Sequence, residues 1–350
     1  MIGHPQFIFG AVMFSVGALV AWLFWMLPVW SRPGIFFAVT VVPDFRNSAE
    51  AHRLLRNYRL QTLLHVAVGF ALILAGALLL HFVLLILGAL WLAVGPLVAV
   101  SHAHKMALPH AVAVSTIREA SLSPRTTQLP GGWSLELGPF VILLVTAIYL
   151  HLHWDAIPKH FPVHWGIDGR PNGWSARTPV GVYGPLVFGA ALVAGIALLA
   201  YAIPHMARRV PATGATAADF AHRMAILLVG VEFFLAAIFS MVGLLPITGN
   251  PGVVPIVILT VAILASAVLL GRWFSHGRDI SPRGAGDGTP DTCWKYGLFY
   301  FNPDDSALFV EKRIGIGYTI NFAHASAWIV IALTALVPLG GILLALSQQR

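Results

Sequence analysis

The chain has 350 residues, of which 58% are hydrophobic and only 10% are charged, and its mean hydropathy is +0.80. A soluble domain carries about a quarter charged residues, so this composition argues strongly against a water-soluble globule, and the high apolar content argues against a disordered chain. The class that remains is a membrane protein with several spans. The single cysteine, Cys293, excludes an intrachain disulfide and a cysteine-based zinc site.

Uncharged apolar runs of roughly 20 residues predict eight transmembrane helices. The first runs from about Phe7 to Trp30, and it is not a cleavable signal peptide because no Lys or Arg precedes it. Residues 62–100 contain no Asp, Glu, Lys or Arg and would form a helix about 58 Å long, so we expect two spans that turn near His81. The remaining spans are predicted at Leu137–Leu152, Val180–Ile203, Met224–Leu245, Val253–Gly271 and Phe322–Leu346.

The basic residues predict the orientation of these spans. With the N-terminus outside, 17 of the 21 Lys and Arg residues fall in cytoplasmic segments and 4 fall outside, which follows the positive-inside rule. A single span over residues 62–100 would put the first basic loop on the opposite side from the other basic segments, and the distribution would no longer follow the rule. We therefore expect a multi-pass protein of the bacterial inner membrane with both termini extracytoplasmic. The net charge of +7 then reflects contact with the lipid bilayer, and no nucleic acid partner is expected.

The predicted fold is an all-α integral membrane protein with one structured extracytoplasmic loop and one cytoplasmic aromatic, hairpin-like segment. Its predicted regions are residues 1–152 with four spans, the loop 153–179, residues 180–271 with three spans, the cytoplasmic segment 272–321, and residues 322–350 with the last span and the C-terminal tail. Neither polar segment is long enough for a sizeable soluble core of its own.

Four histidines lie in or beside the extracytoplasmic loop: His151, His153, His160 and His164. Imidazoles at this density, with Asp155 nearby, could bind zinc or copper. No spaced ligand motif such as HExxH is present, and histidines also serve as amphipathic anchors at a membrane interface. The sequence therefore favours interfacial anchors, and we expect neither a metal nor another cofactor.

The same loop is rich in residues that fix backbone conformation. Pro158, Pro162 and Pro171 constrain it, and Asn172-Gly173 favours a turn with positive φ at both positions. Trp165 and Trp174 add large rigid contact surfaces. Such a loop suits recognition of a peptide or a lipid headgroup, or packing as a plug over the helices, and composition does not choose between these.

A family resemblance covers about 25 residues of this loop. Pro162-Val163-His164-Trp165, Gly169-Arg170-Pro171-Asn172-Gly173-Trp174-Ser175 and Arg177 resemble the P-x-H…G-x-P-D-G-W-S-x-K signature of a domain in bacterial SdpI-like membrane proteins, which include an immunity and signalling protein against a killing peptide. Asn172 stands where the signature has Asp, and Arg177 where it has Lys. The resemblance implies that the ligand-binding residues are Pro162, His164, Trp165, Gly169, Pro171, Asn172, Gly173, Trp174 and Arg177.

The segment from Trp294 to Asn321 is similar to an uncharacterised C-terminal domain that is often joined to the SdpI-type loop. Its motif residues are Trp294, Tyr300, Asn302, Pro303, Asp305, Lys312, Arg313, Gly315, Gly317 and Asn321. The Gly-x-Gly element lacks the Gly-Lys-Ser/Thr and the strand–helix context of a phosphate loop. We expect a compact interfacial hairpin with aromatic side chains at headgroup depth and basic residues on anionic lipid, and a cytoplasmic regulator is a second candidate partner.

Glu232 is the one carboxylate predicted well inside a span, about 12 Å from its cytoplasmic end. An acid in the bilayer is costly, which suggests a proton relay, a cation site or a substrate contact. The alternative is a protonated side chain with one interhelical hydrogen bond. His65 is a possible partner. The cytoplasmic trio His102, His104 and His110 is predicted to cap the third span.

The resemblance implies a non-enzymatic protein that confers immunity to, or senses, an extracytoplasmic peptide or envelope stress. Two alternatives remain: a small transporter that uses Glu232, and a membrane-embedded metal-dependent enzyme that uses the histidine-rich loop. Against the enzyme stands the absence of a nucleophile–base pair or of spaced metal ligands in the sequence.

Overall fold

The computed structural model describes residues 5–31, 34–79, 81–113, 132–165, 170–206, 216–249 and 287–348, with six helical residues between 258 and 269. The predicted span Val253–Gly271 and the motif residue Gly169 therefore fall largely or wholly outside the described residues. About 70% of the structure is helical.

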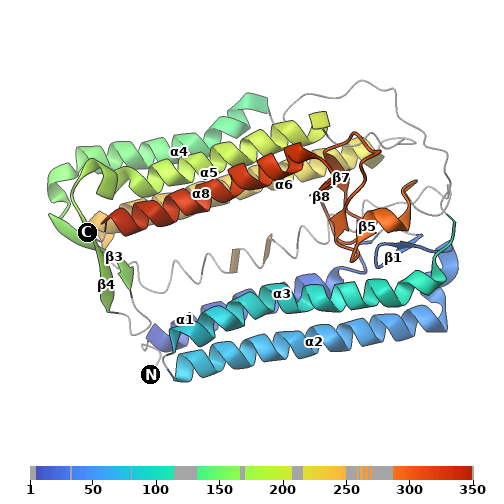
Figure 1. The fold of residues 1–350 in the computed structure, drawn as a ribbon. Helices are drawn as coiled ribbons and strands as arrows, with labels where there is room; N and C mark the ends of the chain where they lie inside the picture. Colours follow the sequence, from blue (N-terminus) through green and yellow to red (C-terminus); the bar gives the residue numbers. More distant parts are fainter. Residues whose placement is uncertain are drawn as a thin grey trace.

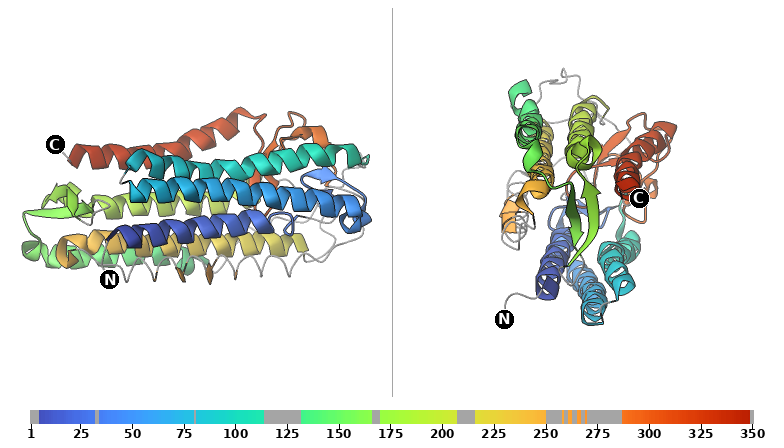
Figure 2. Two further views of the ribbon diagram at one scale, coloured as in Figure 1. Left: turned by 90° about the horizontal axis from the view of Figure 1, so that it is seen from below. Right: turned by 90° about the vertical axis from the view of Figure 1, so that its left-hand side faces the viewer.

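The long helices of the described chain form two groups (Figure 1). The first group contains α1 (Pro5–Met26), α2 (Ala49–Leu78) and α3 (Phe82–Ala107). The second group contains α4 (Gly132–Leu152), α5 (Pro179–Met206), α6 (Thr216–Thr248) and α8 (Ala325–Gln348). Within the second group α6 packs against both α4 and α5, whereas α8 packs against α5. The end-on view of Figure 2 separates the two groups clearly.

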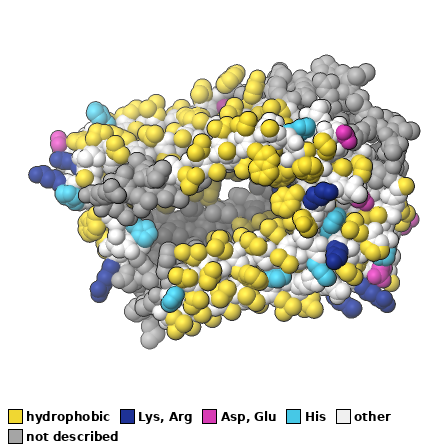
Figure 3. Space-filling view, viewed as in Figure 1, with side chains coloured by type: hydrophobic (Ala, Val, Ile, Leu, Met, Phe, Trp, Pro, Cys, Tyr) yellow, Lys and Arg dark blue, Asp and Glu magenta, His cyan; other side chains and the backbone are white. Residues whose placement is uncertain are grey.

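Five of these helices, α2 to α6, are long and apolar enough to cross a membrane. The described apolar parts of α1 and α8 are shorter, at Phe14–Met26 and Ala325–Leu336. On the face shown in Figure 3, hydrophobic side chains cover most of the described surface along the helices, while Lys and Arg lie toward its two ends. The chain is therefore a membrane-embedded protein that contacts the bilayer, although the predicted number of eight spans is not confirmed.

The predicted turn near His81 is confirmed, because α2 ends at Leu78 and α3 begins at Phe82. Glycines let these two helices approach closely. A Cβ atom on Gly76 would lie 2.8 Å from the backbone nitrogen of Leu85, and one on Gly88 would lie 2.9 Å from that of Ile73. The glycines of this helical hairpin lie along the contact between α2 and α3, and the turn that joins the two helices contains no glycine.

The short elements gather at the two ends of the helices (Figure 1). One end, here called the β3–β4 end, carries η3 (Trp154–Ala156), β3 (His160–Trp165), β4 (Pro171–Ala176) and both chain termini. The other, the β5–β8 end, carries β1 (Ile35–Phe36), β2 (Val39–Thr40), η1 (Pro43–Asn47), η2 (Leu108–His110), η4 (Asp291–Cys293), β5 (Trp294–Lys295), β6 (Phe299–Tyr300), β7 (Phe309–Glu311) and β8 (Tyr318–Ile320). The segments predicted to share a side of the membrane thus share an end.

The expectation of an all-α protein needs correction, because the described chain contains four two-stranded antiparallel sheets. In the β7–β8 sheet, for example, Phe309 pairs with Ile320 and Val310 with Thr319. Aromatic and β-branched pairs of this kind stabilise sheets. The all-α expectation rested on long apolar runs, which identify spans and carry no information about two- or three-residue strands between them.

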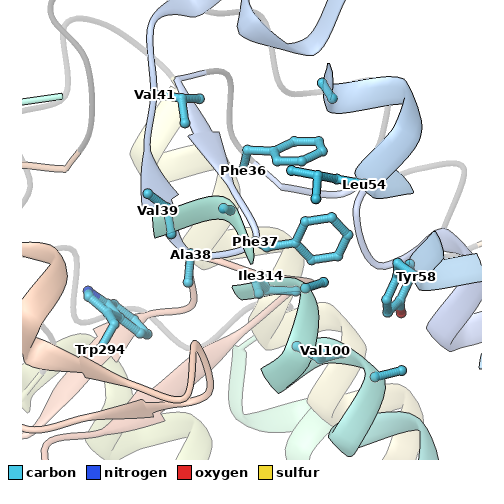
Figure 4. Packing of buried hydrophobic residues seen from close by; sticks show 14 of the residues in the cluster. Phe36, Phe37, Ala38, Val39, Val41, Leu54, Tyr58, Val100, Trp294 and Ile314 are labelled. Carbon is cyan, nitrogen blue, oxygen red and sulfur yellow. The ribbon is translucent and has the colours of Figure 1, made fainter. Parts of the chain in front are cut away.

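A hydrophobic cluster at the β5–β8 end joins the first helix group to the segment 287–322 (Figure 4). At its centre is the turn Phe37–Ala38 between β1 and β2, with φ of 46° and 64°. A non-glycine residue in this region costs about 1 kcal/mol or more. Burial of Phe37 offsets the cost, and its carbonyl oxygen bonds His104 Nδ1 at 2.8 Å. His104, predicted to cap the third span, lies in the last turn of α3 and also holds this turn.

Candidate functional site

The β3–β4 hairpin is fastened to the second helix group through one of its faces. Phe161 and Ile157 are buried in a cluster of side chains from α4, α5 and α6. Arg177 Nη1 donates to the backbone oxygens of Trp154 and Ile157 at 3.2 and 3.1 Å, which holds the turn before β3 against the residue after β4. The hairpin is thus built as a fixed element at this end.

The opposite face of the hairpin is open. Pro162 pairs with Trp174 across the strands, and the Trp174 side chain is 51% exposed. The next cross-strand pair is His164 with Gly173, where a Cβ atom on the glycine would lie 2.9 Å from that of His164. His164 Nδ1 is hydrogen-bonded to Asn172 Oδ1. The neutral amide that replaces the signature's carboxylate therefore still ties the two strands together.

The structure brings most of the residues predicted to bind a ligand onto this one hairpin. Those described are Pro162, His164, Trp165, Pro171, Asn172, Gly173, Trp174 and Arg177. They divide by role. Arg177 and Gly173 hold the hairpin in shape, whereas the side chains of Trp174 and His164 are exposed. Ligand binding by the exposed residues stays a prediction.

The four histidines of the metal hypothesis are spread over two elements. His151 and His153 lie at the end of α4, and His160 and His164 lie on β3. The His153 ring packs at a tilt against Tyr149 with ring centroids 4.2 Å apart, and its Nδ1 bonds the Tyr149 carbonyl oxygen. Over the residues that the structure describes, no group of three or more His, Cys, Asp or Glu side chains is placed to hold a metal ion.

A second candidate lies inside the second helix group. Glu232 on α6 is fully buried and interacts with Glu136 on α4, which is 5% exposed. Among the described residues, none of the four carboxyl oxygens has a hydrogen-bond partner. The helices are close beside this Glu136–Glu232 pair, since a Cβ atom on Gly138 would lie 2.4 Å from Phe233 Cζ. Burying unpartnered carboxyl groups is costly, which makes this pair a candidate for function.

The prediction that Glu232 is the only acid well inside a span is therefore wrong. The predicted fourth span began at Leu137, one residue after Glu136, whereas α4 begins at Gly132. One signal could have revealed it: Leu137–Leu152 has 16 residues, too few to cross about 30 Å of hydrocarbon. Extending that span toward its N-terminus includes Glu136. His65, the other suggested partner, packs against Trp91 of α3 in the first helix group.

The segment 287–322 contains a buried cation that is fully paired. Arg313 donates from Nη2 to Asp287 Oδ1 at 2.7 Å, from Nη1 to Asp291 Oδ1 at 2.5 Å, and from Nη1 to the Ala38 carbonyl oxygen at 2.7 Å. Burial acts to raise the pKa of Asp287, but the Arg313 guanidinium holds that pKa well below its usual range. Arg313 was expected to contact anionic lipid, and instead it joins the β1–β2 turn to this segment.

The other motif residues of this segment also bond to one another. Tyr300 Oη donates to Asp305 Oδ2 at 2.8 Å, and Asn302 Nδ2 donates to Tyr300 Oη at 3.1 Å. Asn321 Nδ2 donates to the backbone oxygens of Asn302 and Asp305 at 2.8 and 3.0 Å. These contacts fasten the turn between β6 and β7 to the residue after β8. The buried polar groups are satisfied, as expected for a structural network.

The remaining motif residues shape or flank this network. The Arg313 guanidinium lies over the Trp294 ring at 5.3 Å from its centroid. Gly315 and Gly317 have φ of 79° and 107° in the turn between β7 and β8. Lys312 is exposed beside them, and Pro303 is exposed in the preceding turn. Tyr300 is buried, so only part of the aromatic run expected at headgroup depth is exposed.

Two family models match parts of the chain. Residues 141–189 match DUF1648, a domain of unknown function. This stretch contains the end of α4, the β3–β4 hairpin and the first part of α5. Residues 303–328 match DUF5808, a family of unknown function. No curated protein and no solved structure matches the chain.

Proposed function

We propose that this polytopic membrane protein recognises an extracytoplasmic peptide through the exposed face of the β3–β4 hairpin, as an SdpI-like immunity or sensing protein of the bacterial inner membrane. The observation that carries the proposal is the two-sided hairpin: Phe161 is buried against the helices while Trp174 is half exposed. The hairpin also lies within the stretch that matches DUF1648, a domain found in SdpI-like proteins.

The geometry of the hairpin suits binding rather than simple connection of two helices. A rigid element loses little conformational entropy when a ligand binds, and Arg177 supplies that rigidity from the end of β4. Exposed tryptophans commonly contribute much of the contact energy of an interface. His164 adds a polar group next to Trp174 on the same hairpin.

The position of the hairpin supports the same proposal. In the end-on view of Figure 2, β3 and β4 lie across the end of the molecule, between the two helix groups. They contact α5, α6 and α8. A peptide that arrives at this end would meet the hairpin before it meets the helices, and a change in the hairpin would act directly on three spans.

Orientation is tested by cysteine labelling after Cys293 is replaced by Ser. Lys159 and Lys295 are exposed at opposite ends of the molecule. With a membrane-impermeant thiol reagent on intact cells, Lys159→Cys should react and Lys295→Cys should not. The reverse pattern would place the hairpin in the cytoplasm and exclude an extracytoplasmic ligand.

Recognition is tested by survival of a sensitive bacterial host that expresses the chain, with a panel of membrane-active peptides added outside. Protection against a peptide in the panel should be lost in Trp174→Ala and in His164→Ala. It should persist in the matched change Trp133→Ala, because Trp133 is 75% exposed near the other end of α4. Membrane insertion, measured by fractionation, should be equal in all three variants, because insertion depends on the spans.

Two results would contradict the proposal. Protection that survives both Trp174→Ala and His164→Ala would show that the hairpin is a connector. Stoichiometric zinc or copper in the purified protein, together with loss of function in variants of His151, His153 and His160, would favour the metal-dependent enzyme instead.

A further inference from the structure

We propose that Glu136 and Glu232 together form an intramembrane proton-binding site, which exchanges its proton with water at the β5–β8 end. The site is separate from the hairpin and goes beyond the recognition function. It rests on contacts between α4 and α6, two helices long and apolar enough to cross a membrane.

The chemistry of the site follows from what surrounds the two carboxyl groups. Both side chains are more than nine-tenths buried, they interact with each other, and in the described part of the chain no donor from another residue reaches their four oxygens. Two adjacent carboxylates in a low-dielectric environment repel strongly, so the pair cannot carry two negative charges. A proton held by one carboxyl group removes one charge and gives the pair a donor that the protein does not otherwise supply.

The neighbouring elements do not offer a competing partner within the described residues. Among the residues whose side chains the structure describes, the titratable groups that they carry are Tyr149 and His151 on α4, Tyr183 and Tyr201 on α5, and His160 and His164 on β3. On α6 itself, Arg223 lies nine residues before Glu232, about 14 Å along the helix. The interactions that the structure gives Glu232 come from Glu136 and from burial.

The position of Glu136 defines the route by which a proton reaches the pair. It lies four residues after Gly132, the first residue of α4, and therefore about 6 Å from that end of the helix. This end of α4 points toward the β5–β8 end of the molecule (Figure 1), which the basic residues assign to the cytoplasm. Proton exchange should accordingly follow the cytoplasmic pH.

A carbodiimide tests the site directly, because N,N′-dicyclohexylcarbodiimide reacts with protonated carboxyl groups in apolar surroundings. The full-length protein in lipid nanodiscs is treated over a range of pH, and adducts are quantified by mass spectrometry. We expect an adduct at Glu232 or Glu136 that decreases as the pH rises. Asp155, whose side chain is 99% exposed, serves as the internal control and should stay unmodified.

The variant Glu136→Gln tests whether the two groups act as one site. Removing the neighbouring acid removes the repulsion, so the pH at which half of the Glu232 labelling is lost should fall by about one unit, a tenfold change in proton affinity. Glu136→Asp keeps an acid in place and should retain most of the original pH dependence. It also provides a variant with a smaller perturbation if the amide impairs folding.

A second measurement addresses sidedness in proteoliposomes of known orientation. Labelling should change when the pH is varied on the side of the β5–β8 end, and not when it is varied on the hairpin side. The proposal is overturned if the Glu232 midpoint is unchanged in Glu136→Gln, if labelling is independent of pH, or if sodium or magnesium ions protect the pair at constant pH. The last result would identify a metal-cation site.

Discussion

Two buried charged sites in this protein differ in how they are satisfied. At the β5–β8 end, the buried Arg313 lies against Asp287 and Asp291, whose side chains are 7% and 12% exposed, and short hydrogen bonds join the three groups. Within the helices, Glu136 and Glu232 are buried against each other, yet no donor from another described residue reaches their carboxyl oxygens. The first site unites opposite charges, whereas the second unites two acidic groups.

The difference separates a structural role from a functional one. A buried ion pair with complete hydrogen bonding fixes the position of the segments that it joins, here the β1–β2 turn and the segment 287–322. A buried pair of acids without partners reduces stability, so its presence needs another reason. We therefore expect substitutions to reduce stability strongly at the first site and little or not at all at the second.

The largest effect is expected for Arg313→Ala. Its removal leaves two carboxyl groups buried without their cation, which typically costs about 3–5 kcal/mol. This loss of stability should make Cys293 react faster with a thiol reagent, because Cys293 lies in η4 together with Asp291. Arg313→Lys keeps the charge and loses the planar fork, so its labelling rate should be intermediate. Wild-type labelling in Arg313→Ala would show that the network is dispensable.

Acid should weaken the same site to a smaller extent. The pKa of Asp287 in the folded protein lies below its usual value near 4, so its contribution is complete above about pH 4 and is lost as the pH falls toward the folded value. We expect a loss on the order of 2 kcal/mol. The loss is measured from the rate at which Cys293 reacts with 4,4′-dithiodipyridine, a thiol reagent that works in acid. Asp287→Asn should remove most of this pH dependence, and an unchanged profile would assign it to another group.

The sequence predicted the large elements of the fold from physical rules. Long uncharged runs identified the helices, and the excess length of residues 62–100 identified the turn between Leu78 and Phe82. Prolines predicted a structured loop at residues 153–179, but the turn expected at Asn172-Gly173 is wrong, because both residues lie in β4 and neither has a positive φ. In each case the decisive signal lies within a few tens of residues along the chain.

The buried charged contacts could not be predicted in the same way, because they join distant segments. Arg313 bonds the carbonyl oxygen of Ala38, 275 residues away, and a basic residue beside a span has the same local pattern whether it contacts lipid or a buried acid. Glu136 was missed because its helix begins five residues before the predicted span. Only packing of α4 against α6 brings it to Glu232.

Glu232→Gln should have a much smaller effect on stability than Arg313→Ala. The amide keeps the shape of the side chain and removes a buried acid, so the free energy of unfolding should stay within about 1 kcal/mol of the wild type or rise. Reversible unfolding in mixed micelles measures it. Ser240→Ala on the same helix is the matched control, because its hydroxyl group is also buried without a partner in the described chain. Destabilisation by several kcal/mol in Glu232→Gln would mean that the pair is structural.

The smallest effect on stability is expected for Trp174→Ala. Its side chain is 51% exposed on the open face of the hairpin, and substitutions at such positions usually change stability by less than about 0.5 kcal/mol. Phe161→Ala, the matched change on the buried face, should cost about 3 kcal/mol, because it leaves a cavity against α4, α5 and α6. Thermal unfolding of the two variants in the same detergent gives the comparison. If Trp174→Ala were as destabilising as Phe161→Ala, Trp174 would be part of the packing that holds the hairpin on the helices. The main argument for a binding surface on the exposed face of the hairpin would then be lost. A stable Trp174→Ala variant that no longer protects cells would instead assign that face to recognition.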